Sequence, residues 1–177
     1  MSCMVKHCIN SLDLEAISKH LNYDPDTGLF TWVMPKRGLK VGSVAGSIKK
    51  DTGYVIINHN RTLYRAHRLA FLFMGEVLES YVDHINGVRH DNRWSNLRQC
   101  SHSQNNYNSG VRKCSSGLKG AYWDGRKNKW YSRIQHQNET KWLGHFDSAE
   151  EAHLAYRKAS DKYHKEFANY GEFKSGI

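Results

Sequence analysis

The chain has 177 residues, 39% of them hydrophobic and 12% aromatic, which suits one ordinary domain or two small ones and argues against a disordered protein. Its 26 lysines and arginines exceed its 17 acidic residues, so the formal net charge is +9, and nucleic acid is the kind of partner that this charge favours. No apolar run approaches membrane-spanning length, which excludes a membrane partner, and the four cysteines form no CxxC pair, so free thiols in a reducing cytoplasm are expected.

The first part of the chain is expected to mix short helices with paired strands. Helical spacing of apolar residues, Pro- and Gly-containing turns and runs of aromatic or β-branched residues mark the elements. The predicted elements are a helix at 11–21, a turn at 24–28, a strand at 29–33, a hairpin from 53–57 and 62–64, and a helix at 65–74. Between Lys36 and Arg68, eight basic residues stand against one acidic residue, so this stretch is suited to phosphate.

A compact strand, turn and helix unit is expected next. Residues 81–84 predict a short strand, Asn86-Gly87 has the chemistry of a tight turn, and residues 91–97 predict a polar loop. Residues 101–108 predict a short helix with Ser101 as its N-cap. The order is β-turn-β-α, compact and rich in loops.

Residues 111–117 are expected to link two domains, because small, polar and basic residues replace the apolar periodicity there. The predicted domains are therefore 1–110 and 118–177. The second is expected to form three antiparallel strands, at 120–123, 129–134 and 140–144, followed by one helix capped by Ser148 with Glu151. Six basic and two acidic residues lie between Leu118 and Gly144.

The most informative stretch is rich in Asp, His and Asn and spans 26 residues. It contains Asp83-His84-Ile85-Asn86-Gly87, Asp91-Asn92-Arg93, Asn96-Leu97-Arg98 and Asn105-Asn106-Tyr107-Asn108. Hydrolysis of a phosphodiester needs an activated water and neutralisation of charge on the phosphate. A neutral imidazole can take the proton of water, and a carboxylate is a hard ligand for a divalent cation. An isolated Asp-His pair is more often a structural hydrogen bond, but the whole pattern favours a site.

This pattern resembles the HNH nucleases, in particular the branch found in phage and homing endonucleases, over about residues 23–108. The resemblance implies an α+β nuclease domain with a ββα-metal (His-Me finger) core at about 62–108. It implies that His84 is the general base and that Asn96 orients the histidine or fixes the loop. It also implies that Asp83 and Asn105 bind one Mg²⁺ (or Mn²⁺) ion per active site. For the ligand at Asn105 there are three alternatives, His102, Asn106 and Asn108.

Residues 118–173 resemble the AP2 DNA-binding domain, a three-stranded antiparallel sheet packed on one helix. The resemblance rests on Gly120 to Trp123, on 129–134, on 143–147 and on the helix that follows. It implies a sheet that enters the major groove of DNA. The implied DNA-binding residues are Arg126, Lys129, Trp130, Arg133, Lys141 and Trp142. Alternation places Trp130 and Ser132 on one face and Tyr131 and Arg133 on the other, and the sequence leaves open which face meets the helix.

Together the two resemblances imply a sequence-directed, metal-dependent DNA endonuclease of phage or mobile-element homing type, acting in the host cytoplasm. Its partner would be double-stranded DNA, without a small-molecule cofactor. Nicking or double-strand cleavage and monomer or dimer all remain open. The alternative is a DNA-binding transcriptional regulator that carries an inactive HNH unit, and an RNA-binding module is a third, weaker hypothesis.

Overall fold

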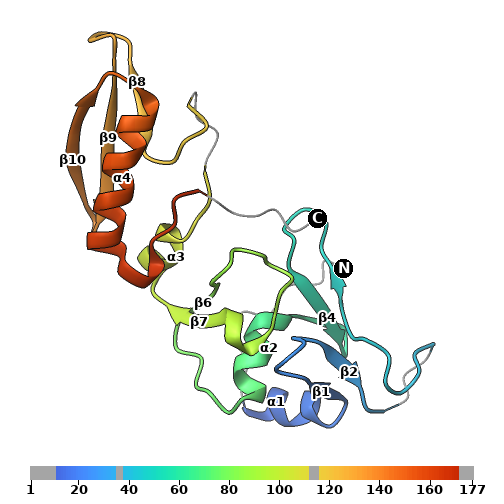
Figure 1. Cartoon of the computed structure of the whole chain (residues 1–177). Helices are drawn as coiled ribbons and strands as arrows, with labels where there is room; N and C mark the ends of the chain where they lie inside the picture. Colours follow the sequence, from blue (N-terminus) through green and yellow to red (C-terminus); the bar gives the residue numbers. More distant parts are fainter. Residues whose placement is uncertain (1–10, 35–37, 112–115, 172–177) are drawn as a thin grey trace. The chain divides into compact units, whose positions relative to one another are not determined.

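A computed structural model describes residues 11–34, 38–111 and 116–171 of the chain (Figure 1). The described residues form two compact units. One contains the residues up to His84 together with Val88–Gln99, and the other contains Ile85–Gly87 together with the residues from Cys100 onward. Within the described ranges, no helix combines the length and the apolar character needed to cross a membrane.

The N-terminal unit is a mixed α+β fold of small antiparallel sheets and short helices. Its elements are α1 (Ser11–Ser18), β1 (Leu21–Tyr23), β2 (Phe30–Trp32), β3 (Ser47–Ile48), β4 (Val55–His59), β5 (Thr62–Arg65), α2 (Ala66–Phe73), β6 (Tyr81–His84), the 3-10 helix η1 (Trp94–Asn96) and β7 (Leu97–Cys100). β1 pairs with β2, β4 lies between β3 and β5, and β6 pairs with β7. One apolar core, which includes Ile17, Phe30, Ile57 and Leu69, holds these pieces together.

Two elements of this unit differ from the prediction. The first helix ends at Ser18 rather than at residue 21, because Leu21 begins β1 and lies opposite Trp32 of β2. Residues 97–100 form strand β7, although the loop predicted at 91–97 includes the first of them. Leu97 and Cys100 of this strand are buried, and the polar residues between them are half-buried. Both differences arise from pairing with a partner strand, which the local sequence does not encode.

The C-terminal unit is a three-stranded antiparallel sheet with one long helix. Its elements are α3 (His102–Tyr107), β8 (Ala121–Asp124), β9 (Lys129–His136), β10 (Glu139–Phe146), α4 (Ala149–His164) and the 3-10 helix η2 (Lys165–Phe167). The strand order is β10-β9-β8, and α4 packs on all three strands around Ile134, Tyr156 and Ala159 (Figure 1). A side chain at Gly120 would place a Cβ 2.2 Å from the Tyr156 ring, so glycine permits this close packing.

The predicted starts of α3 and α4 are confirmed. The side chain of Ser101 accepts a hydrogen bond from the backbone N–H of Gln104, whose side chain accepts one from the Ser101 N–H in return. The Ser148 side chain accepts a bond from the Glu151 N–H at 3.1 Å. These caps satisfy amide groups that have no partner inside the helix.

The short helix α3 packs with the C-terminal unit. The Tyr107 ring stacks on His164 of α4, with 3.8 Å between ring centroids and 5° between planes. Lys119 Nζ donates to the carbonyl oxygens of Tyr107 and Ser109 at 2.8 and 2.6 Å. The compact units therefore divide between Gln99 and Cys100, while residues 112–115 of the predicted linker lie outside the described residues.

Cys100 is buried. The other three cysteines, Cys3, Cys8 and Cys114, lie outside the described residues. The expectation of free thiols stays a prediction at all four positions.

Candidate active site

Strand β6 ends with two buried polar residues, Asp83 and His84. The Asp83 carboxylate pairs with Arg98 of the neighbouring strand β7. Asp83 Oδ2 accepts hydrogen bonds from Arg98 Nε at 3.0 Å and Nη2 at 2.9 Å. Two charge-assisted hydrogen bonds hold the Asp83 carboxylate in place, and the Arg98 guanidinium partly balances its negative charge.

His84 is held by the loop that follows. Its Nε2 lies 3.2 Å from Asn92 Oδ1, and both side chains are buried. Because the Asn92 oxygen can only accept, Nε2 carries the proton and Nδ1 is the unprotonated nitrogen of the neutral ring. Burial lowers the pKa of His84, and the Asn92 hydrogen bond and Asp83 oppose that effect. His84 is therefore neutral at neutral pH, which is the form able to take a proton from water.

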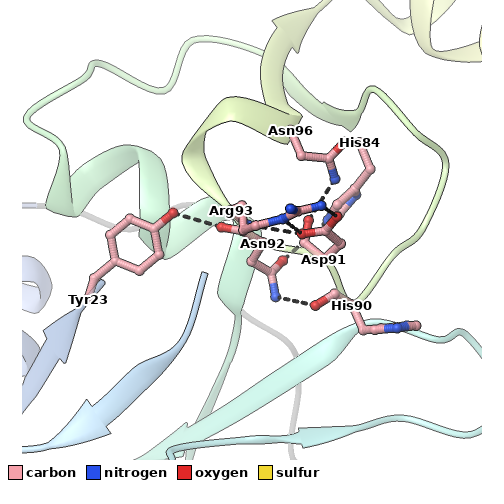
Figure 2. A network of polar contacts seen from close by, with 7 residues as sticks. All are labelled: Tyr23, His84, His90, Asp91, Asn92, Arg93 and Asn96. Atoms are coloured by element: carbon pink, nitrogen blue, oxygen red, sulfur yellow. Dashed lines mark hydrogen bonds and ion pairs between the residues drawn. The ribbon is translucent and has the colours of Figure 1, made fainter. Parts of the chain in front are cut away.

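The loop from His90 to Asn96 is fixed by its own hydrogen bonds (Figure 2). Asn96 Nδ2 donates to the carbonyl oxygen of Asp91 at 2.8 Å, and Arg93 binds the Asp91 carboxylate through Nε and Nη2. Asn92 Nδ2 donates to the His90 carbonyl oxygen at 3.2 Å. Asn96 thus bonds to the loop backbone and Asn92 bonds to His84, and the role expected for Asn96 stays a prediction.

Two aromatic rings, those of His67 and Tyr54, lie beside His84. The ring centroid of His67, on α2, is 5.0 Å from that of His84. The ring centroid of Tyr54 is 5.0 Å from that of His67 and 5.9 Å from that of His84. His67 Nδ1 is buried and has no hydrogen-bond partner in the part of the chain described. Burial, with the neighbouring His84 and arginines, holds the pKa of His67 well below its ordinary value. His84 thus lies against the imidazole of His67 and the phenol ring of Tyr54.

The proposed metal ligands lie in different compact units. Asp83 belongs to the N-terminal unit, and Asn105 lies on α3 in the C-terminal unit. Within the described ranges, no group of three or more His, Cys, Asp and Glu side chains could hold a metal. Mg²⁺ needs few such groups, because it keeps several waters and binds through one or two carboxylates. The buried carboxylate of Asp83 fits such an ion, which would share that carboxylate with Arg98.

The three alternatives to Asn105 make contacts of their own. His102 Nδ1 and Asn106 Nδ2 lie 3.3 Å apart, and the buried Asn108 accepts a hydrogen bond from Asn169 at 3.2 Å. Asn105 is half-buried. The contact of Asn106 uses Nδ2 and not the amide oxygen, so the choice among the four candidates stays a prediction.

The face of the C-terminal sheet opposite α4 is lined with aromatic and basic side chains. Ser132 and Ile134 are fully buried against α4, so alternation directs Tyr131 and Arg133 to the other face. Tyr131 stacks between Tyr122 and Trp142 of the adjacent strands at 5.3 Å each, and Arg133 lies 5.4 Å from the Tyr122 ring. We call Tyr122, Tyr131, Arg133 and Trp142 the open face.

The six DNA-binding candidates do not all lie on the open face. Arg133 and Trp142 belong to it, and they are directly opposite each other in the β9–β10 register. Trp130 shares the α4 side of β9 with Ser132, and Lys141 is opposite the buried Ile134 with its Nζ 5.4 Å from the Tyr163 ring of α4. Arg126 lies in the β8–β9 turn, and Lys129 pairs with Asp147 at 3.0 Å.

Residues 64–107 match the model of a family described as HNH endonuclease. The match covers about a quarter of the chain and includes Asp83, His84, Asn96 and Asn105. The comparisons with curated proteins and with solved structures found no match. The matched segment thus carries the buried histidine and carboxylate described above and supports a DNA nuclease, and the three-stranded sheet lies outside it.

Proposed function

We propose that the protein is a divalent-metal-dependent endonuclease that hydrolyses phosphodiester bonds of double-stranded DNA. The observation that carries this proposal is the neutral, buried His84, whose Nε2 is fixed by Asn92 next to the Asp83 carboxylate. Both residues lie inside the segment that matches HNH endonucleases.

In the proposed reaction, His84 Nδ1 takes a proton from water as the water oxygen forms a bond to phosphorus. The bond between phosphorus and the leaving sugar oxygen breaks, and that oxygen gains a proton from solvent. Asn92 keeps Nε2 protonated, and this sets which nitrogen can act as base. Asn96 holds the loop backbone that carries Asn92.

A single Mg²⁺ or Mn²⁺ ion, when bound, would neutralise charge on the phosphate and on the leaving oxygen. Asp83 is proposed as its carboxylate ligand. Asn105 is proposed as the amide ligand from its place in the matched segment. Oxygen ligands of both kinds suit these hard cations better than Zn²⁺.

The C-terminal unit is proposed to bind the duplex as an AP2-like module. The open face supports this, because stacked aromatic rings and an arginine suit base edges and sugar-phosphate. Trp142 and Arg133 would contact the DNA from this face, with Arg126 and Lys129 at its edge. Trp130 and Lys141 remain proposed contacts, although their strand positions lie on the α4 side. Such a module would direct cleavage to particular sequences, as in a phage or mobile-element homing enzyme in its host's cytoplasm.

One observation favours the alternative, a DNA-binding regulator with an inactive nuclease unit. Arg98 places a guanidinium on Asp83, where an active enzyme needs a divalent cation. If Arg98 excludes the metal, the chain would bind DNA without cutting it.

The test is cleavage of supercoiled plasmid and phage DNAs with Mg²⁺, with Mn²⁺ and with chelator. His84→Ala is compared with His90→Ala, which changes an exposed histidine of the neighbouring loop. We expect nicked or linear DNA that requires metal and His84 and that persists in His90→Ala. Tight binding without cleavage under every metal and DNA condition would support the regulator instead.

A further inference from the structure

We propose that the N-terminal turn at residues 23–28 is the positioning element of the active site, with Tyr23 acting on His84 through Asn92. The inference rests on the proposed function. These residues precede the segment that matches the nuclease family, which begins at residue 64. They belong to the same compact unit as His84, so the contact is internal to that unit.

The first contact is a buried hydrogen bond from Tyr23. Its hydroxyl donates to the Asn92 backbone oxygen at 2.7 Å, across 69 positions of sequence (Figure 2). Burial raises the pKa of Tyr23 to about 12, so the hydroxyl stays protonated and can donate. The ring is buried and lies 4.8 Å from the Phe30 ring, centroid to centroid, which limits its movement.

The second contact is between backbones. The Trp94 N–H donates to the Pro25 carbonyl oxygen at 2.9 Å. Gly28 has a φ of +73°, and a Cβ there would lie 2.3 Å from the backbone nitrogen of Arg93 and 2.4 Å from the carbonyl carbon of Asn92. Only glycine accepts both this φ and this approach without strain. The backbone of the turn therefore packs directly against the backbone of the loop at Asn92 and Arg93.

The turn has a defined shape of its own. Asp24 Oδ1 accepts the Asp26 N–H at 3.0 Å, and Asp24 Oδ2 accepts the Thr27 hydroxyl at 2.8 Å. The Gly28 N–H also donates to the Asp24 carbonyl oxygen at 2.8 Å. These local bonds give the turn a fixed surface against which the loop can be set.

The contacts form one chain that ends at the base. Tyr23 fixes the backbone of Asn92, and the Asn92 side chain fixes Nε2 of His84. The direction of Nδ1 follows, because the ring is rigid. A displacement of about 1 Å at a reacting group can cost about 100-fold in rate, so a remote contact of this kind has a kinetic effect. Tyr23 is thus a positioning residue that need not touch DNA.

The test compares Tyr23→Phe with Tyr64→Phe in the full chain. Each variant loses one hydroxyl, and both tyrosines are buried in the same core. We expect Tyr23→Phe to lower kcat by about 10-fold, which corresponds to the loss of one hydrogen bond, while KM and DNA affinity stay at the wild-type values. Tyr64→Phe should leave kcat unchanged. Gly28→Ala should lower kcat further, by about 100-fold if it folds.

A second readout does not depend on cleavage. The ¹⁵N resonances of the His84 imidazole report which nitrogen is protonated and how well Nε2 is bonded. We expect them to move in Tyr23→Phe and to stay in place in Tyr64→Phe. Unchanged His84 resonances in Tyr23→Phe would overturn the proposal, whether or not kcat falls. If the wild-type chain does not cut DNA, the proposed function fails, and these spectra still decide whether the turn positions His84.

Discussion

The active-site region and the open face of the sheet place their polar groups in opposite environments. Asp83, His84 and Asn92 are buried, and each has a hydrogen-bond partner at a defined atom. On the open face, Trp142 is exposed and is held mainly by ring stacking. Burial favours the neutral form of His84, as the proposed base requires, whereas the proposed DNA-binding surface has to stay accessible to solvent.

The two regions should respond differently to the removal of a side chain. In the buried region, removal of one group leaves another without its partner, so the effects pass from residue to residue. On the open face, substitution of an exposed ring leaves no buried polar group without a partner, so we expect its effect to fall on the proposed affinity for DNA. Substitutions in one region are therefore expected to leave the properties of the other unchanged.

The largest expected effect is that of His84→Gln. Loss of a general base typically lowers the rate by about 10²- to 10⁴-fold, and we expect a fall in that range under saturating DNA. The affinity for uncut DNA, measured with Ca²⁺ in place of Mg²⁺, should not change. A variant that keeps its rate would remove His84 from the chemistry.

The second largest effect is expected on the affinity for DNA, in Trp142→Ala. Trp142→Ala removes an exposed ring of the open face, and burial of a large apolar side chain against the DNA would be worth about 1.5–3 kcal/mol. The control is Trp123→Ala, because Trp123 is similarly exposed, 45% against 56% for Trp142, but alternates to the α4 side of β8. We expect the Kd for DNA to rise only in Trp142→Ala. Equal losses in both variants would show that DNA binding does not depend on the open face.

The third effect is a loss of stability at low pH. The pKa of His67 is lower in the folded chain than in the unfolded chain, because burial disfavours its charged form. The unfolded chain therefore takes up the proton first, and stability is lost as the pH falls below about 6.5. The nearby Arg65, Arg68 and His84 disfavour the charge further.

Urea unfolding between about pH 7.5 and pH 5.5 measures this loss. His67→Gln should reduce the pH dependence, and His90→Gln, at an exposed histidine, should not. An unaltered pH dependence in His67→Gln would assign the acid sensitivity to other groups.

The smallest effect is expected at Lys129. Its ion pair with Asp147 is exposed at both ends, so Lys129→Ala should change the free energy of unfolding by less than about 1 kcal/mol. If Lys129 contacts a phosphate, the variant should lower the slope of log Kd against log salt by about one. An unchanged slope would remove Lys129 from the DNA contact.

The sequence predicted what local signals encode. Ser101 and Ser148 marked helix starts, alternation marked β8 to β10, and the Asp83-His84 spacing pointed to the segment that matches a nuclease family. It did not predict the bond between Tyr23 and Asn92, because residues 69 positions apart meet only after the core forms. It also left open which sheet face meets the helix, since both faces of β9 carry an aromatic side chain.

We propose that cleavage depends on buried His84 and that affinity for DNA depends on the open face. Single-turnover cleavage and equilibrium binding, measured on one DNA for His84→Gln and Trp142→Ala, test it most directly. We expect His84→Gln to lose the cleavage rate and keep the affinity for DNA, while Trp142→Ala loses affinity and cleaves at the wild-type rate once DNA is saturating. Loss of both properties in both variants, or cleavage that does not need His84, would contradict it.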